Sequence, residues 1–267
     1  MTDQTTPLAG LVGPHRESHE PRLDAMLHLA EGVTPVAGFL KWNGAEGIGE
    51  RWGMADNGQW GCCGFSAWQH ANMAKGHSPA DGPLTTWLPA YPSLLPAYWA
   101  YGLAMGEVGQ PPRSPDQPDF GVSNASMLAW ALKLGLIYGY GEVTDEYHDW
   151  FAQTFDGVLV GQVLDGNVAS RDFEHTPRIP WDTMATPDGH DTLTIITHPD
   201  GSGATVTWGA VQPYTAAYRQ TNWTDRWVIF DKDDDKVNWT ALEAALADVH
   251  GVDVMTTARA NYELLHP

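Results

Sequence analysis

The sequence has very few cysteines. Only two of its 267 residues are cysteine, and these two, Cys62 and Cys63, are adjacent in the stretch GQWGCCGFSAWQH. Adjacent cysteines cannot build an ordinary disulfide framework. We therefore expect the chain to be made in a reducing cytoplasm.

Basic residues are also scarce. Lysine and arginine together number 14 against 33 aspartates and glutamates, which gives a formal net charge of −19. A surface this negative argues against nucleic acid and anionic membranes as partners, because both are polyanions. It favours solubility, or docking to a basic protein.

Long hydrophobic runs are missing as well. No stretch approaches 18 consecutive apolar residues, so we expect no transmembrane helix. The first ten residues, MTDQTTPLAG, lack a charged region followed by an apolar one, so we expect no signal peptide. The hydrophobic fraction of 43% is nevertheless that of a globular protein with a substantial core.

The pattern of apolar residues divides the chain into a helical first half and a strand-rich second half. We expect an arm and a short helix over 1–34, a helical lobe over about 57–135 and an antiparallel β lobe over about 136–250. The expected helices cover 18–31, 63–75, 94–105, 123–134 and 240–249, and the expected strands 136–140, 158–164, 192–198, 204–209 and 226–230. This order predicts an α+β fold of two lobes with a cleft between them.

Cys63 is the residue most suggestive of chemistry. It lies at the expected start of a helix, where backbone N–H groups and the helix dipole favour a thiolate. An activated thiol needs a proton-transfer partner, and His190, at the start of an expected strand, is the best candidate. His70 lies two helical turns from Cys63, so we expect it to be a packed or hydrogen-bonded core histidine.

Two simpler interpretations of the cysteines stay open. A cysteine in a cytoplasmic protein is often only a small buried hydrophobic residue. The adjacent pair could also be redox-active. Neither a metal nor a cofactor is expected: the histidines of HRESHE (15–20) are in the wrong order for the zinc helix motif, and DKDDDK (231–236) lacks the glycine of a calcium loop.

Several motifs, in order, resemble papain-like cysteine peptidases. These are Cys63 opening a helix, Gly-His at 189–190 before a strand, and a strand ending in Thr-Trp-Gly at 207–209. The likeness is closer to papain-fold cysteine peptidase-like proteins of bacteriophages and bacteria. Their motif Asn-x-x-x-Gly-Asp-Cys, with a histidine seven residues later, resembles NGQWGCC (57–63) followed by His70. The likeness implies a papain-like domain over 35–267.

The resemblance assigns roles to three residues. It makes Cys63 the nucleophile, His190 the general base, and Asn57 the oxyanion donor, with Gln59 as the fallback. The chain departs from the family at Val206, which stands where an asparagine orients the histidine, and at Cys62, which replaces the aspartate. Thr207 follows Val206 but should point to the other side of its strand. Asp191, Asn222 and Asp225 are distant candidates for the third catalytic member.

The resemblance implies a papain-like cysteine hydrolase, a peptidase or amidase encoded by a phage and acting on a peptide or protein substrate. The alternative is a catalytically inactive papain-fold protein that forms or decorates a virion, with other virion proteins as partners. In both cases the chain is made in the host cytoplasm.

Overall fold

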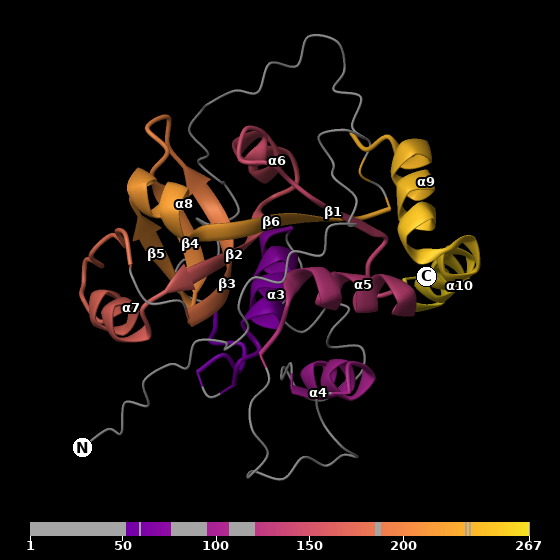
Figure 1. Cartoon of the computed structure of the whole chain (residues 1–267), viewed down its shortest axis with the longest axis horizontal. Helices are drawn as coiled ribbons and strands as arrows, with labels where there is room; N and C mark the ends of the chain where they lie inside the picture. The colour runs from indigo at the N-terminus through magenta and orange to yellow at the C-terminus, as the bar shows by residue number, and fades with distance from the viewer. Residues whose placement is uncertain are drawn as a thin grey trace.

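The computed structural model describes residues 52–58, 60–75, 95–106, 121–184, 188–232, 234 and 236–266. Within these residues it contains eight helices and a six-stranded sheet (Figure 1). The helices are α3 (Cys63–Ala74), α4 (Leu95–Ala104), α5 (Asn124–Leu134), α6 (His148–Thr154), α7 (Gly166–Phe173), α8 (Ala216–Asn222), α9 (Trp239–His250) and α10 (Val252–Leu265). The strands are β1 (Gly139–Glu142), β2 (Val158–Leu164), β3 (Asp188–Thr197), β4 (Gly203–Thr207), β5 (Ala210–Tyr214) and β6 (Trp223–Phe230).

The sheet has the order β1-β6-β2-β3-β4-β5, and all neighbouring strands are antiparallel. Four strands follow each other as a meander from β2 to β5. The last strand, β6, lies between β1 and β2. The expected α+β class with an antiparallel sheet in the second half of the chain is therefore confirmed.

Helices cover both faces of the sheet. On β6, Asp225 accepts a hydrogen bond from Asn124 of α5, and Arg226 forms an ion pair with Asp145, just before α6. Because neighbouring residues of a strand point to opposite faces, α5 and α6 lie on opposite sides of the sheet. The long helix α3 packs against β3, β2 and β4, and its Cys63 meets Asp191 on the same face as α5.

Helix α3 is the centre of the core. All twelve of its residues are buried, although its sequence contains serine, glutamine, histidine and asparagine. Its Phe65 ring contacts Tyr98 and Tyr101 of α4 and Trp130 of α5, with ring centroids 5.7 to 6.2 Å apart. Buried tryptophans continue this packing at positions 52, 68, 130, 181, 208, 223 and 227. The high tryptophan content therefore serves, in large part, to fill the core.

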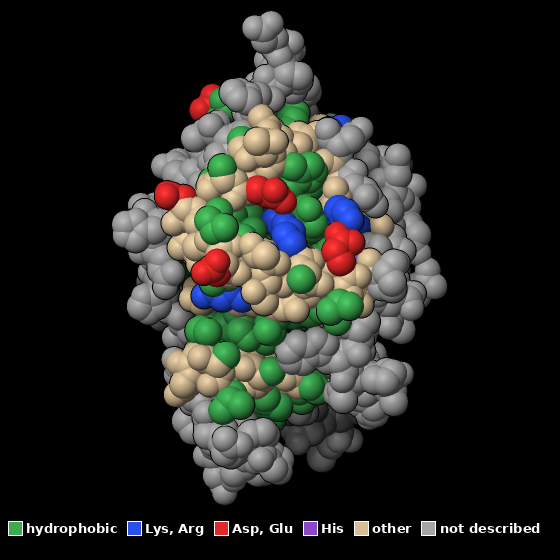
Figure 2. Space-filling view, turned by 90° about the vertical axis from the view of Figure 1, so that its right-hand side faces the viewer, with side chains coloured by type: hydrophobic (Ala, Val, Ile, Leu, Met, Phe, Trp, Pro, Cys, Tyr) green, Lys and Arg blue, Asp and Glu red, His purple; other side chains and the backbone are tan. Residues whose placement is uncertain are grey.

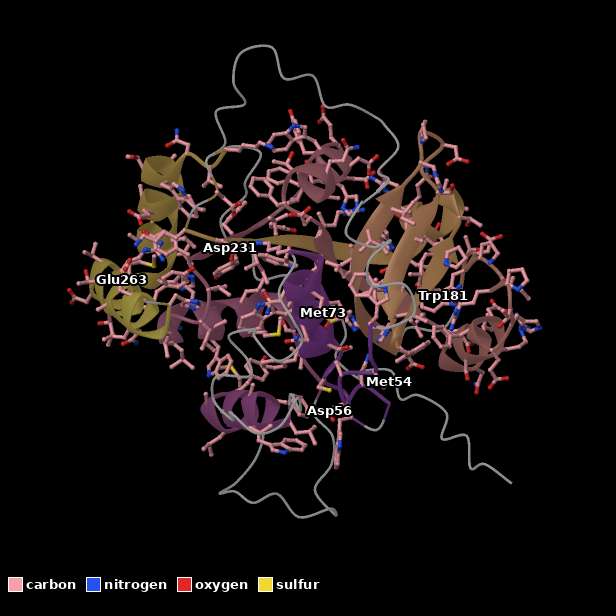
Figure 3. The ribbon with its side chains drawn as sticks, turned by 180° about the vertical axis from the view of Figure 1, so that it is seen from behind. Met54, Asp56, Met73, Trp181, Asp231 and Glu263 are labelled. Carbon is pink, nitrogen blue, oxygen red and sulfur yellow. The ribbon has the colours of Figure 1, made fainter. Side chains whose placement is uncertain are left out.

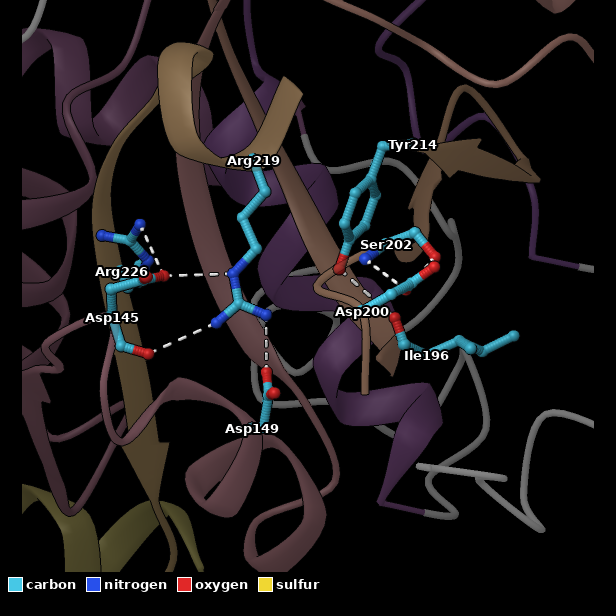
Figure 4. Close-up of polar contacts among 8 residues, drawn as sticks. All are labelled: Asp145, Asp149, Ile196, Asp200, Ser202, Tyr214, Arg219 and Arg226. Carbon is cyan, nitrogen blue, oxygen red and sulfur yellow. Dashed lines mark hydrogen bonds and ion pairs between the residues drawn. The ribbon is translucent and has the colours of Figure 1, made fainter. Parts of the chain in front are cut away.

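A buried arginine ties α8 to α6 and to the segment just before it. Arg219 is 7% exposed; its Nε lies 3.0 Å from Asp145 Oδ1 and its Nη1 lies 2.7 Å from Asp149 Oδ1 (Figure 4). Arg226 of β6 shares the same Asp145 carboxylate. In the same view Tyr214 of β5 donates its hydroxyl to the backbone carbonyl of Ile196, which links β5 to β3.

The two C-terminal helices dock beside α5. At the end of α5, Gly135 has a φ of +75°, and a Cβ added there would lie 2.4 Å from the backbone nitrogen of Tyr262 in α10. Only glycine allows so close an approach. The side of the molecule that carries α9 and α10 shows acidic side chains next to basic ones (Figure 2), and on these helices Arg259 pairs with Glu243 and Glu263 with Lys232.

The expected elements are largely present, with some differences. The helices expected at 63–75, 94–105, 123–134 and 240–249 correspond to α3, α4, α5 and α9. The strand expected at 136–140 begins only at Gly139, and the sequence patterns did not predict β5, α6, α7, α8 or α10. The expected arm and the helix at 18–31 lie outside the described residues.

Candidate functional site

Cys63 is the first residue of α3, as the sequence predicts. A tight loop leads into this helix: Asn57 donates its backbone N–H to Met54 at 3.0 Å, and Ala55 and Asp56 have φ values of +46° and +61°. Figure 3 shows Met54 and Asp56 beside one end of α3 and Asp231 toward the other. The tight turn of this loop therefore lies just before the first residue of α3.

The Cys63 thiol has a carboxyl partner. Its Sγ donates to Asp191 Oδ2 at 3.4 Å, and its side chain is buried, with 1% of the residue exposed. Burial, and then the nearby Asp191 carboxyl, raise the pKa of the Cys63 thiol well above its ordinary value. At neutral pH this environment keeps the sulfur protonated, and the thiol is the unreactive form of cysteine.

Asn124 holds the Asp191 carboxyl from the other side. Its Nδ2 donates to Asp191 Oδ1 at 2.8 Å and to Asp225 Oδ1 at 3.3 Å. It is the first residue of α5, whose N-cap is Ser123, so the helix start fixes the position of the amide. Burial, and then the Asp225 carboxyl, raise the pKa of Asp191 well above its ordinary value.

Asp225 lies on β6, which β2 separates from Asp191 on β3. Its carboxylate accepts more hydrogen bonds than that of Asp191. It accepts hydrogen bonds from the backbone N–H of Gly161 at 3.2 Å and from Trp227 Nε1 at 2.8 Å. The carboxylate fits only because position 161 is glycine, since a Cβ there would lie 2.6 Å from both of its oxygens. A register shift between Gly161 and Gln162 opens the pairing of β2 and β6 at this point.

His190 belongs to a different arrangement. Its Nε2 lies 2.6 Å from Thr207 Oγ1, and its ring stacks on Trp208 with centroids 4.7 Å apart and an interplanar angle of 29°. Only 2% of the residue is exposed, and burial lowers its pKa to about 3. The imidazole is therefore neutral at physiological pH.

Cys63 and His190 do not pair in this structure. Among the described residues, the polar partner of Cys63 is Asp191 and that of His190 is Thr207. Because His190 and Asp191 are neighbours on β3, they point to opposite faces of the sheet, and only Asp191 faces α3. The geometry differs from the expected Cys–His pair, because the strand presents its aspartate, not its histidine, to the start of the helix.

The sequence also did not predict the hydrogen-bond partner of His190. Val206 pairs with Leu193 and lies in the core, whereas Thr207 lies on the same face as His190. Thr207 does point away from Val206, as expected, but this is the side on which His190 lies. The hydrogen-bond partner of the His190 ring is thus the hydroxyl of Thr207.

The remaining candidates have the following places. Asn57 is buried, with 1% exposed, and its Oδ1 has no hydrogen-bond partner among the residues that the structure describes. Gln59, the fallback donor, lies outside the described residues. His70 is a hydrogen-bonded core histidine, as predicted: its Nε2 lies 3.1 Å from the carbonyl of Gly53, and burial lowers its pKa to about 4. Neither cysteine forms a disulfide bond.

Sequence reasoning missed Asn124 and gave Asp191 and Asp225 only as remote candidates for a third catalytic member. A helix start after Ser123 was visible, but nothing in the sequence indicated that its first residue would bridge two carboxyls. In the described part of the chain, no group of three or more His, Cys, Asp or Glu side chains is placed to hold a metal ion. No helix of the described residues is long and apolar enough to cross a membrane.

Comparison with known proteins gives no relative: no family model, no curated protein and no solved structure matches the chain.

Proposed function

We propose that the chain is a papain-like protein that does not hydrolyse peptide bonds in the observed conformation and instead serves as an assembly component that docks onto a basic protein. One observation supports this most: the thiol and the imidazole are buried on opposite faces of β3 and engaged with other partners. Hydrolysis by a cysteine enzyme requires a thiolate within reach of a base. Here the thiol is protonated and its expected base lies elsewhere.

The charge of the molecule supports the choice of a basic partner. Six of the described basic residues form ion pairs with carboxylates of the same chain: Lys75, Arg171, Arg219, Arg226, Lys232 and Arg259. Each pair cancels one positive charge against one negative charge, so the net charge of −19 belongs to carboxylates that have no basic residue of this chain to balance them. A protein with such a surface is attracted to a cationic one and repelled by polyanions. Given the resemblance to phage-encoded proteins, the partner we propose is another virion protein.

The absence of hydrolysis is tested with the full-length chain and Cys63→Ala as its control. Both are incubated with a mixed peptide library and with crosslinked cell-wall peptides, and mass spectrometry counts new chain ends. We expect the same products from both proteins. Cleavage that disappears in Cys63→Ala would overturn this part of the proposal.

The assembly role is tested on gradient-purified particles of the phage that encodes the chain. Quantitative mass spectrometry should find the chain at a fixed ratio to the major capsid protein. A wash at about 1 M salt, where the Debye length falls to about 3 Å, should release it if charge attraction holds it. Particles that lack the chain would refute the assembly role.

A cysteine hydrolase is the second candidate, because Cys63 opens a helix and meets a carboxyl that an amide orients. A nucleophile, a carboxyl and an orienting amide in series have the arrangement of a catalytic triad, in which the carboxyl accepts the thiol proton after losing its own. The library experiment above decides between the two functions.

A further inference from the structure

Four polar side chains from four elements form one buried chain of hydrogen bonds. Cys63 of α3 donates to Asp191 of β3, and Asn124 of α5 donates to both Asp191 and Asp225 of β6. A residue larger than glycine next to Cys63 would disturb it, since a Cβ at Gly64 would lie 3.2 Å from Asp191 Oδ2. We call these four residues the thiol–carboxyl network.

The network holds two carboxyls without a cation. In the described part of the chain, no Lys, Arg or His side chain hydrogen-bonds to Asp191 or Asp225. Neutral donors alone do not offset two buried negative charges, so at neutral pH the two carboxyls retain a proton between them. Asp225 has four donors and Asp191 has two, which places the negative charge on Asp225 and the proton at Asp191.

We propose that Asp191, oriented by Asn124 and kept protonated by its neighbour Asp225, is the positioning residue that controls the ionisation of the Cys63 thiol, in place of His190. A carboxyl is a stronger acid than a thiol, so Asp191 loses its proton before Cys63 as the pH rises. The Cys63 thiol then ionises beside two negative carboxylates, which oppose removal of its proton. Asp191→Asn or Asp225→Asn removes one of these two charges. The network controls the thiol in this way whether or not the site hydrolyses a substrate.

Each element packed around Asp191 contributes a defined group. Helix α3 contributes Cys63, α5 contributes the uncharged Asn124, and β6 contributes Asp225. The next residue of β6, Arg226, points to the opposite face and pairs with Asp145. Burial, and then the Asp225 carboxyl, raise the pKa of Asp191, and the hydrogen bonds from Cys63 and Asn124 only partly oppose this. Burial, and then the Asp191 carboxyl, raise the pKa of Cys63.

The test is a titration by NMR of the full chain labelled with 13C at cysteine Cβ, whose shift reports thiol ionisation without any reagent reaching the sulfur. The signal of Cys63 is assigned by its persistence in Cys62→Ala. Wild type is compared with Asp191→Asn and with His190→Gln, a matched control on the neighbouring residue of the same strand. We expect Asp191→Asn to lower the midpoint of the Cys63 titration by about one pH unit or more, a tenfold rise in thiolate at fixed pH. His190→Gln should leave it unchanged.

Two further measurements keep the inference falsifiable if Asp191→Asn fails to fold. In wild type labelled at aspartate Cγ, the Asp191 signal should titrate at higher pH than the exposed aspartates. In Asp225→Asn, that titration should move to lower pH, and the Cys63 midpoint should fall with it. A Cys63 midpoint that follows His190→Gln, or that ignores both aspartate variants, overturns the proposal. Because the readout is protonation, the result is separate from the hydrolysis and particle experiments.

Discussion

Replacing Gly161 by alanine puts a methyl group where the Asp225 carboxylate now lies. The added Cβ would be 2.6 Å from both carboxylate oxygens, so the side chain must move away from β2. It then loses its bonds to the Gly161 N–H and to Trp227 Nε1. Overpacking costs about 1–3 kcal/mol, and a hydrogen bond to a charged group is worth about 1.5–3 kcal/mol. Because the displaced carboxylate regains some solvent, we expect a loss of about 3 kcal/mol in the free energy of unfolding.

Urea denaturation followed by tryptophan fluorescence measures this loss, and two comparisons isolate its cause. Gly166→Ala is the matched control, since the nearest atom to its Cβ lies 3.7 Å away and the residue begins α7. It should leave stability unchanged or raise it by up to about 1 kcal/mol. In an Asp225→Ala background, Gly161→Ala should cost less than about 1 kcal/mol, because the clashing atoms are gone. Equal costs of Gly161→Ala with and without Asp225 would refute the reasoning.

Three further predictions concern the rest of the fold. Gly135→Ala should cost about 2 kcal/mol more than Gly106→Ala in the same urea assay, because the two glycines share a φ near +75° but only the first lies against the backbone of α10; equal costs would contradict the close approach. Arg219→Lys should cost about 2 kcal/mol, since lysine cannot bond two carboxylates in a fork, and a neutral result would show that the fork of the guanidinium contributes nothing beyond its charge. The pKa of His190 is lowered to about 3, below its value of about 6.5 in the unfolded chain, so its contribution to stability is present above pH 6.5 and lost as the pH falls. His190→Gln should therefore reduce the slope of stability below pH 6.5 by up to about 1.4 kcal/mol per pH unit; an unchanged slope would mean that the imidazole is not buried in its neutral form.

Local signals in the sequence were sufficient for the elements that position the site. The start of α3 at Cys63 and the end of α5 at Gly135 follow from backbone preferences that neighbouring residues determine. Strand β3 was equally visible from its apolar run. The short helices α6 and α8 were not, because one or two turns of helix are held by tertiary contacts such as the ion pairs of Arg219.

The partners of Cys63 could not be predicted in the same way. Whether His190 or Asp191 faces α3 depends on which of two adjacent residues lies on the covered side of β3, and a shift of one residue exchanges them. The sequence gives no local signal for that choice at a strand end. Asn124 and Asp225 lie 67 and 34 residues from Asp191 in the chain, and only the assembled sheet brings them together.

The order of strands in the sheet has a consequence for synthesis. Strands β1 and β2 leave the ribosome early, yet the strand that joins them, β6, is made after all the others. A nascent chain that ends before Trp223 can form the meander from β2 to β5, but β2 then has an open edge and β1 has no neighbour. Open edges invite pairing with other chains. Translation that stalls in this interval should leave an aggregation-prone product. Synthesis of the eight residues Trp223–Phe230 supplies β6, which covers the edge of β2 and pairs with β1.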